Sequence, residues 1–360
     1  MKKCLFLDYQ KSDKAAENRL SLVMQGFKEN NFSVDYIYIV KNKYIYIYDI
    51  LKQIIRYFRL LSKMDKGDIL YVYGEIHLPF LLLYAKRKGV RIFTERTEYP
   101  FEIIFPEKVS YKTKTLSYLY RKSLKKMDLF IVGTYALKEY YQRFAAEETQ
   151  FLVIPFLIDL TKFQDGINIK KENIITYCGY MGSNNKDGVE NIIDVFCKSE
   201  YAYKNFNLIL IGDAAPDEFQ KLKEIVAQRD SNKKIIFTGR LKEHQEVINY
   251  LMKSKLHILA KPNTKRNKGA FPSKIAEYLA TSTPSIVTNV GDVSIYLRDN
   301  ESIFLVEPDD NMKFSERLTD VLKNKELMSK VGKKGREVVE EYTPKKQIKK
   351  ILEFANFEKQ

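Results

Sequence analysis

Short apolar runs alternate with longer segments along the whole chain, and this alternation restricts the fold more than any other feature of the sequence. The first six runs have the length and composition of buried strands, and each gap between them is long enough for a crossover helix. They cover residues 4–7, 34–40, 69–73, 91–94, 129–132 and 151–154. The pattern predicts a parallel α/β domain.

The alternation pauses after Pro155 and then resumes with a second series of runs. These runs cover residues 174–178, 208–211, 234–238, 257–260, 285–288 and 303–306. A chain of 360 residues accommodates two domains of ordinary size. We therefore predict an N-terminal domain over 1–160, a linker over 161–172 and a C-terminal domain over 173–342. Ligands should bind where strand C-terminal ends and helix N-termini face a cleft between the two domains.

The composition is that of a globular protein, with 45% hydrophobic and 30% charged residues. No run approaches the roughly 18 to 20 apolar residues that cross a bilayer. Asp8 interrupts the apolar N-terminal run, which favours a strand over a signal peptide. Cys4, Cys178 and Cys197 are too scattered for a disulfide framework or a metal site, which fits a reducing cytoplasm.

The formal net charge is +15, from 61 Lys and Arg residues against 46 Asp and Glu residues, and it indicates an acidic partner or surface. Anionic lipid, a nucleotide and nucleic acid all have the required charge. The basic residues are spread over the whole chain, without an Arg-rich arm or a nucleic-acid motif, so we expect no nucleic-acid partner.

Residues 271–291 combine a predicted helix that carries one inward carboxylate, Glu277, with a stop at Pro284, a short strand and a turn at Gly291. A carboxylate near a helix start, beside the C-terminal edge of a strand, suits a nucleotide ribose. Its two oxygens can accept hydrogen bonds from both ribose hydroxyls. This pattern predicts the donor-nucleotide corner of a sugar-transfer enzyme.

Residues 179–188 form a glycine-rich loop between a predicted strand and a predicted helix. Such a loop can cradle a phosphate, because glycine lets backbone N–H groups approach the anion and the helix dipole favours it. Lys186 would supply positive charge. Glycine-rich βα turns also occur without any ligand, so this alternative stays open.

Two further loops are basic. Gly239 follows a predicted strand and is itself followed by Arg240, which either meets a phosphate or is an exposed side chain on an ordinary loop. The loop over 261–269 holds four basic residues directly before Phe271, where a helix N-terminus would help to attract a diphosphate. They are Lys261, Lys265, Arg266 and Lys268.

In this order, the segments resemble the donor-binding domain of retaining glycosyltransferases of family 4, of the type called glycosyl transferases group 1. The resemblance covers the last half of the chain strongly and the first half in outline. It rests on residues 179–188, 208–213, 237–241, 271–280, 283–291 and 332–337 with Tyr342. It implies the α/β GT-B fold of two Rossmann-like doubly wound domains, and a last helix over 343–360 that crosses back to the N-terminal domain. It also implies a retaining reaction without metal or cofactor.

The sequence departs from the family pattern at two positions. The family has two glutamates separated by seven residues, and Gly269 stands where the first is expected. Tyr180 stands where the family has a phosphate-facing arginine, so Lys186 and Arg240 would carry more of the diphosphate charge. The donor-binding residues that the resemblance implies are Gly179, Lys186, Gly239, Arg240, Phe271, Ser273, Lys274 and Glu277.

In the N-terminal domain, the loop after the strand at 91–94 carries Glu95 and Glu98. It resembles the family loop that bears a His or Glu, so either carboxylate could accept the acceptor's proton or hold the donor sugar. Glu98 is the preferred catalytic candidate and Glu95 the second. The alternatives are two surface glutamates that pair with Arg96, or His77 in the same role.

Residues 49–63 have the spacing of an amphipathic helix, with Leu51, Ile54, Ile55, Phe58 and Leu61 on one stripe and basic residues on another. The basic stripe is Lys52, Arg56, Arg59 and Lys63, and residues 111–126 hold a second patch rich in lysine and tyrosine. Such helices can lie on an anionic membrane. The alternative is a crossover helix that shows its basic residues to water.

We therefore expect a cytoplasmic glycosyltransferase, peripheral on the inner face of a bacterial plasma membrane. It would move a sugar from a nucleotide diphosphate sugar to a glycan or polyprenyl-linked acceptor in capsule or other cell-surface polysaccharide synthesis. Two alternatives are a non-catalytic membrane-associated partner with the same fold and a nucleotide-sugar epimerase. The sequence contains three histidines, which disfavours the epimerase.

Overall fold

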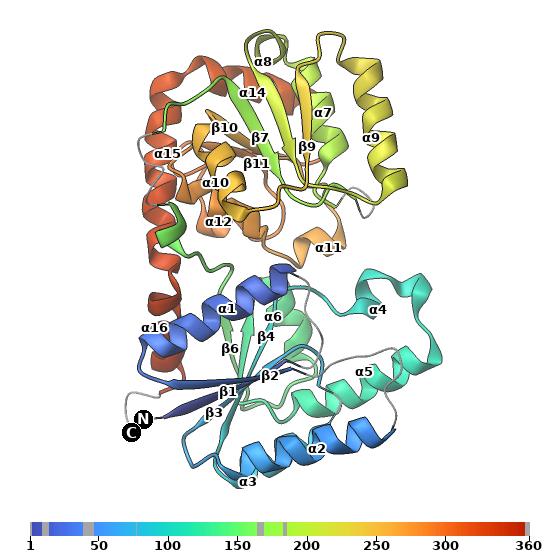
Figure 1. Ribbon diagram of the computed structural model, residues 1–360, viewed down its shortest axis with the longest axis vertical. Coiled ribbons are helices and arrows are strands. Elements are labelled where there is room, and N and C mark those ends of the chain that lie inside the picture. The colour runs from blue at the N-terminus through green and yellow to red at the C-terminus, as the bar shows by residue number, and fades with distance from the viewer. Residues whose placement is uncertain are drawn as a thin grey trace. The chain divides into compact units, whose positions relative to one another are not determined.

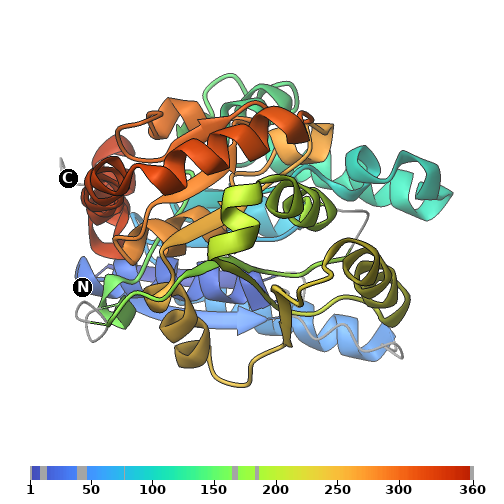
Figure 2. The same cartoon turned by 90° about the horizontal axis from the view of Figure 1, so that it is seen from above.

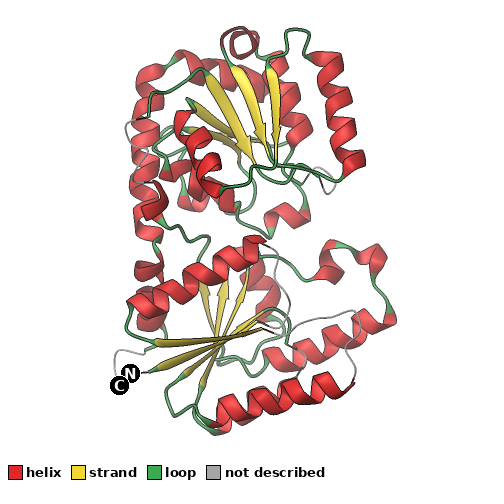
Figure 3. Cartoon of the chain, in the orientation of Figure 1, coloured by secondary structure: helices red, strands yellow, loops and turns green. Residues whose placement is uncertain are grey.

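The computed structural model describes residues 2–8, 14–38, 47–76, 78–163, 169–182 and 186–356. The chain divides into two compact units, with residues 1–157 and 343–360 in the first and residues 158–342 in the second (Figure 1). Each unit contains a six-stranded parallel sheet. In each unit, the sheet is a central layer with helices on both faces (Figure 3). The α/β prediction is confirmed.

The sheet of the first unit has the strand order β2-β1-β3-β4-β5-β6. Its strands are β1 (Lys3–Asp8), β2 (Ser33–Tyr38), β3 (Ile69–Tyr73), β4 (Arg91–Arg96), β5 (Leu129–Val132) and β6 (Gln150–Val153). The helices are α1 (Lys14–Glu29), α2 (Ile47–Ser62), α3 (Pro79–Arg87), α4 (Phe101–Ile104), α5 (Tyr111–Leu124), α6 (Tyr135–Gln142) and α16 (Pro344–Phe354), with a short 3-10 turn η1 (Pro106–Lys108).

Alternate residues of β1 enter two different cores, as the two-residue period of a strand requires. Cys4 and Phe6 pack in a cluster with residues of α1 and α16. Leu5 and Leu7 pack in a second cluster with residues of α2 and α3. The sheet is therefore buried on both faces, which explains why its strands read as continuous apolar runs.

The C-terminal helix α16 packs in the first unit. Ile348, Ile351 and Leu352 lie in the same core cluster as Phe27 of α1, and a Cβ at Gly26 of α1 would come within 2.6 Å of the Pro344 carbonyl oxygen. The glycine lets the two helices approach closely. Helix α16 therefore belongs to the first unit although it follows the second unit along the chain.

The second unit has the strand order β12-β11-β10-β7-β8-β9. Its strands are β7 (Ile174–Cys178), β8 (Asn207–Ile211), β9 (Ile235–Gly239), β10 (Leu256–Leu259), β11 (Ser285–Thr288) and β12 (Phe304–Val306). The helices are α7 (Val189–Lys198), α8 (Glu200–Asn205), α9 (Pro216–Arg229), α10 (His244–Lys253), α11 (Lys265–Lys268), α12 (Ser273–Ala280), α13 (Val293–Tyr296), α14 (Asn311–Lys323) and α15 (Lys325–Val339), with 3-10 turns η2 (Leu160–Phe163) and η3 (Glu340–Tyr342). Helix α14 packs against α7 and α8 (Figure 2).

All twelve predicted strands are present, with ends that differ by at most two residues within the described chain. Residues 39 and 40, which were predicted to extend the second strand, lie outside the described residues. The second unit begins at Ile158, before the predicted linker, and Phe163 within η2 is buried. Among the helices of the described residues, none has the length and apolar character needed to span a membrane.

Candidate functional site

The strand order of the second unit reverses between β7 and β10, which are neighbours at the centre of the sheet. In an open parallel sheet, the chain leaves two such strands in opposite directions, so a crevice forms beyond their C-terminal ends. Gly179 follows β7 and Lys261 lies two residues beyond β10. The glycine-rich loop and the basic loop thus meet at the place where ligands of this fold class bind.

A buried charge cluster occupies this place. The Asp187 carboxylate contacts Lys261 Nζ through Oδ1 at 2.8 Å and Lys274 Nζ through Oδ2 at 2.6 Å. The Tyr177 hydroxyl donates a further hydrogen bond to Oδ2 at 2.9 Å. The side chains of Asp187 and Lys261 are each 5% exposed, and that of Lys274 is 24% exposed.

The pKa values follow this arrangement. Burial by itself would raise the pKa of Asp187, but the ammonium groups of Lys274 and Lys261 hold it well below its usual range. Burial lowers the pKa of Lys261 to about 8. The attraction of Asp187 opposes this shift, and the repulsion from Lys274 adds to it. Burial also opposes the charge of Lys274, but Asp187 raises its pKa above the usual value. The carboxylate is thus ionised beside two cations.

Asn267 of α11 connects the cluster to the glycine-rich loop. Its amide nitrogen donates to the main-chain carbonyl of Lys186 at 3.0 Å, and its amide oxygen accepts from Lys261 Nζ at 3.2 Å. The side chain of Asn267 is almost fully buried, so these bonds form in a low-dielectric setting. This residue therefore fixes the two loops to each other.

Two glycines of the loop are required by geometry. A Cβ at Gly179 would overlap the Lys274 side chain and lie 2.6 Å from the Tyr177 hydroxyl oxygen. Gly188, at the N-cap of α7, has φ of 70°, in the left-handed region that glycine favours. A Cβ there would collide with the Ala260 carbonyl after β10. The Lys274 side chain consequently lies directly against the backbone of the glycine-rich loop.

Glu277 lies on α12, one turn after Ser273, and its side chain is 32% exposed. Its Oε1 is 3.4 Å from Nε2 of His244, the first residue of α10. Ser273 is exposed at the start of α12. Phe271 is buried, and its ring meets the edge of Tyr296 at 5.9 Å. Phe271 therefore packs in the unit and supports the turn before α12.

The remaining predicted donor residues lie on the surrounding loops. Gly239, at the end of β9, has φ of 68° and open space where a Cβ would lie, and Arg240 is exposed. Lys186 is half-buried. Tyr180 is 46% exposed, and its hydroxyl accepts a hydrogen bond from the Ala215 amide at 3.1 Å.

Sequence reasoning missed Asp187, the role of Lys261 beside it, and the contact between His244 and Glu277. Lys261 was included only as one of four basic residues on its loop. One signal was present for Asp187, since a carboxylate inside a predicted phosphate cradle needs a cationic partner. Lys274 was predicted as a donor residue, but nothing in the sequence shows that it shares a carboxylate with Lys261.

In the first unit, Glu95 is 1% exposed at the end region of β4. Its Oε1 accepts from Arg19 Nε of α1 at 2.8 Å, and its Oε2 accepts from the Tyr71 hydroxyl at 2.8 Å. Glu95 is therefore not a surface glutamate paired with Arg96. Arg96 instead contacts Glu75 at 3.5 Å and donates to the Tyr120 hydroxyl oxygen at 2.7 Å. Glu98 is half-buried in the following loop, and His77 lies outside the described residues.

Helix α2 turns part of the predicted apolar stripe to the core, since Leu61 is buried and Phe58 packs against the same core cluster. Tyr57, Leu61 and Met64 are buried, whereas Ile55, predicted on the apolar face, is 59% exposed. The prediction was wrong at Ile55 because the buried stripe is centred on Tyr57 and its i+4 neighbour. Lys52, Arg56, Arg59 and Lys63 are all exposed, as a basic stripe requires. Leu51 has no described side chain.

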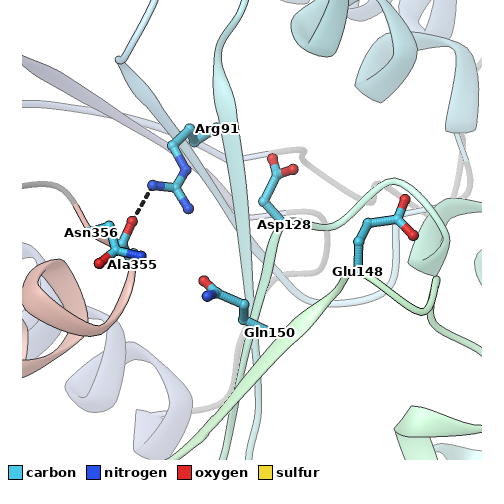
Figure 4. Close-up of a pocket in the computed structure, with 6 residues that line it drawn as sticks. All are labelled: Arg91, Asp128, Glu148, Gln150, Ala355 and Asn356. Carbon is cyan, nitrogen blue, oxygen red and sulfur yellow. Dashed lines mark hydrogen bonds between the residues drawn. The ribbon is translucent and has the colours of Figure 1, made fainter. Parts of the chain in front are cut away.

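A pocket of about 250 Å³ lies near the N-terminal ends of β4, β5 and β6 in the first unit, at the other end of these strands from Glu95 (Figure 4). Arg91 donates to the Ala355 carbonyl at the end of α16. Asp128 accepts from the Ile92 amide at 2.7 Å and pairs with Lys86 at 3.2 Å. These polar groups hold the end of α16 and the strand starts, so the pocket is part of the packing of α16.

Comparison with known proteins identifies the class. Residues 160–338 match the family Glycosyl transferases group 1, which covers most of the second unit. A glycosyltransferase from Rickettsia africae has a TM-score of 0.74 at 17% identity, with 98% of this chain and 97% of that chain covered. A comparison with curated proteins finds no match.

Two more solved structures are similar over their whole length. Sucrose-phosphate synthase from Thermosynechococcus elongatus has a TM-score of 0.71 at 14% identity, with 98% of each chain covered. Anabaena HepE in complex with UDP has a TM-score of 0.71 at 13% identity, with 98% of this chain and 100% of that chain covered. The structural matches establish the GT-B fold. The family match shows that the second unit is a glycosyltransferase domain of the group 1 type, and the protein is accordingly a glycosyltransferase.

Proposed function

We propose that the protein transfers a sugar from a nucleotide diphosphate sugar to an acceptor hydroxyl with retention of configuration, as a member of family 4. The observation that carries this proposal is the convergence of Gly179, Lys274 and Lys261 at the strand-order reversal of a group 1 domain. A cationic site beside a glycine-rich loop suits the leaving diphosphate, since it stabilises charge that develops as the sugar leaves.

In this proposal, Glu277 binds the ribose hydroxyls, because its carboxylate is partly exposed on α12, the helix whose Lys274 lies against the glycine-rich loop. The exposed Ser273 at the start of α12 offers its backbone N–H and hydroxyl. Lys186 and Arg240 add positive charge from the flanking loops, while Gly239 leaves room for the base. This donor set needs no metal and no cofactor.

Within the first unit, we propose Glu98 as the carboxylate that acts on the transferring group. Glu95 is the weaker candidate, because both of its oxygens are occupied by Arg19 and Tyr71 in a buried position. A base must reach a substrate proton. Glu98, half-buried on the loop that follows β4, has more exposure for that purpose.

The experiment is isothermal titration calorimetry with UDP, GDP, ADP and CMP. UDP is tested first because the HepE structure was solved with it. We expect one of these nucleotides to bind. Glu277→Ala should weaken it by about ten- to a hundredfold, since a hydrogen bond to a charged group contributes about 1.5–3 kcal/mol. Arg229→Ala, an exposed substitution on α9, is the control. Failure of all four nucleotides to bind would favour the non-catalytic partner, for which Gly269 and Tyr180 are the supporting features.

The two catalytic alternatives are separated by incubating the enzyme with donor alone. An epimerase converts the sugar without an acceptor, whereas the proposed transferase needs an acceptor hydroxyl. NMR of the product's anomeric proton then tests retention.

We propose an acceptor of the glycan or polyprenyl-linked kind in capsule or other cell-surface polysaccharide synthesis. The matching assay therefore offers short glycans and lipid-linked sugars in parallel.

We also propose that the first unit lies on the inner face of the plasma membrane through α2, α3 and α5. Helix α3 contacts both α2 and α5, so their outer surfaces are continuous. The basic stripe of α2 (Lys52, Arg56, Arg59 and Lys63) is exposed, and the same three helices carry exposed apolar and aromatic side chains. These are Ile55, Phe80, Leu83, Leu116, Tyr111 and Tyr118, and Tyr111 is 87% exposed.

Co-sedimentation with vesicles that contain anionic phospholipid tests this surface. Each basic residue near such a surface contributes about 1 kcal/mol, so replacing all four stripe residues by alanine should lower vesicle binding by up to about a thousandfold. The matched control replaces four exposed lysines of the second unit, Lys204, Lys221, Lys242 and Lys330. Equal losses in both variants would show non-specific attraction to the net charge and overturn the proposal.

A further inference from the structure

We propose that Asp187 is a positioning residue that holds Lys261 and Lys274 as a pair with one surplus positive charge, and that this pair binds the second phosphate of the donor nucleotide through Lys274. The inference rests on the proposed function, because it specifies which part of the donor the cluster recognises. It assigns a role to a buried carboxylate that sequence motifs do not reveal.

The first argument is the charge count. Among the described residues, one carboxylate contacts two ammonium groups, and Asn267 and Tyr177 add uncharged contacts. Glu277 and Lys186, which have opposite charges, also act electrostatically on these lysines. A buried charge is costly unless an opposite charge compensates it. With Lys261 and Lys274 both protonated, the cluster carries one uncompensated positive charge. An anion is the ligand that would compensate it.

The second argument is direction. Asp187 and Lys261 are closed off, with side chains 5% exposed, whereas the Lys274 side chain is 24% exposed. Lys274 is therefore the more accessible of the two cations. Since a Cβ at Gly179 would overlap Lys274, an anion that reaches this ammonium also lies beside the backbone of the glycine-rich loop. A phosphate oxygen is small and charged, which matches such a site better than a base or a sugar.

The third argument is rigidity. Lys274 has a long, flexible side chain, and ordering it on ligand binding would cost entropy. The 2.6 Å contact with Asp187 orders it beforehand, and the Tyr177 hydroxyl in turn orders the carboxylate. Asp187 thus lowers the cost of binding by preorganising the cation. It acts through Lys274 and need not touch the donor.

Calorimetry with UDP and UMP tests the subsite, because the two ligands differ only in the second phosphate. GDP and GMP replace them if the nucleotide panel selects guanine. Wild-type protein should bind UDP at least about tenfold more tightly than UMP. Lys274→Met leaves Asp187 paired with Lys261, so we expect a folded protein. UDP affinity should fall by about tenfold or more while UMP affinity changes less than about threefold. Lys221→Met on α9 is the matched control and should leave both affinities unchanged.

Asp187→Asn tests positioning against simple charge. If Asp187 orders Lys274, the UDP affinity should fall by about tenfold and the UMP affinity should change little. If it acted by its charge alone, removing a negative group would strengthen UDP binding, and the positioning role would be wrong. If the variant does not fold, Tyr177→Phe decides the question. It removes only the hydroxyl that donates to Asp187 and should lower the UDP to UMP preference by about two- to fivefold.

The outcomes separate this inference from the proposed function. Wild-type protein that binds no nucleotide contradicts the proposed function itself. Protein that binds UDP and UMP equally well, or whose UDP preference survives Lys274→Met, keeps its nucleotide site and contradicts only the phosphate subsite. A UDP preference that is lost in both Lys274→Met and Asp187→Asn supports the whole inference.

Discussion

Each unit of the protein buries a carboxylate near the C-terminal ends of its strands, and the two carboxylates differ in the number of cations that they contact. Within the described chain, Glu95 in the first unit has one cationic partner, Arg19, and accepts a hydrogen bond from Tyr71. Asp187 in the second unit has two cationic partners, Lys261 and Lys274, and accepts from Tyr177. Both carboxylates accept a hydrogen bond from a tyrosine. The charge of Glu95 is balanced by one cation, whereas the two cations around Asp187 leave an excess of one positive charge.

The difference teaches how to separate a packing ion pair from a binding cluster. A balanced, closed pair such as Arg19 and Glu95 is complete without a ligand, and removing either partner leaves an uncompensated charge. In a cluster with surplus positive charge and one partly exposed member, the charge is compensated only when an anion binds. By this criterion, we expect the ligand site in the second unit, where the group 1 family match also lies.

The largest expected effect is in the first unit. Glu95→Gln leaves Arg19 buried without its carboxylate, so we expect the free energy of unfolding to fall by about 3–5 kcal/mol. Chemical denaturation followed by circular dichroism measures this loss. Nucleotide affinity should stay unchanged. A variant with normal stability and no turnover would contradict the packing role and restore Glu95 as a catalytic candidate.

The second prediction removes the surplus positive charge of the cluster in the second unit. Lys261→Met leaves Asp187 paired with Lys274 and Tyr177, so the free energy of unfolding should change by no more than about 1 kcal/mol. UDP affinity should fall by about tenfold because the surplus charge is gone. Arg19→Met is the matched variant, since it leaves Glu95 buried with no cation, and it should be strongly destabilising. Similar stabilities for the two variants would remove the distinction between the units.

The third prediction concerns pH. The pKa of Lys261 is lowered to about 8 by burial, with Asp187, Lys274 and Lys186 as the charged groups around it. Above pH 8, Lys261 loses its proton and the surplus charge disappears, so the dissociation constant for UDP should rise. Lys274 stays charged in this range because its pKa is raised. Calorimetry should show binding about three- to tenfold weaker at pH 9 than at pH 7. The same slope in Lys261→Met would assign the effect to another group.

The smallest expected effect is at the surface of the second unit. Asp194 also collects two cations, Lys198 at 2.8 Å and Arg229 at 2.6 Å, but these side chains are 42% and 44% exposed. Solvent compensates their charge, so Arg229→Ala should change the free energy of unfolding by less than about 1 kcal/mol and leave UDP binding unchanged. A tenfold loss of UDP affinity would mean that the number of cations, and not their burial, defines the site.

Much of the fold is readable from the sequence. Residues 69–73, 129–132, 174–178 and 285–288 were predicted with the strand bounds that the structure has. Strands buried on both faces give continuous apolar runs, and crossover helices give gaps of sufficient length. The face of α2 was less readable, because Ile55 and Tyr57 are both compatible with an apolar stripe and only packing on the sheet decides between them.

For this protein, the sequence by itself determined the two series of strands and the order of the donor-site loops, because both are local patterns along the chain. Only the tertiary structure decided the charge partners. Asp187 and Lys274 are 87 positions apart, and Arg19 and Glu95 are 76 positions apart. Their pairing depends on which strands and helices become neighbours, and burial then sets the strength of each charge. The pairing of these residues and their burial cannot be predicted from periodicity or spacing, because those patterns describe single elements and not the contacts between them.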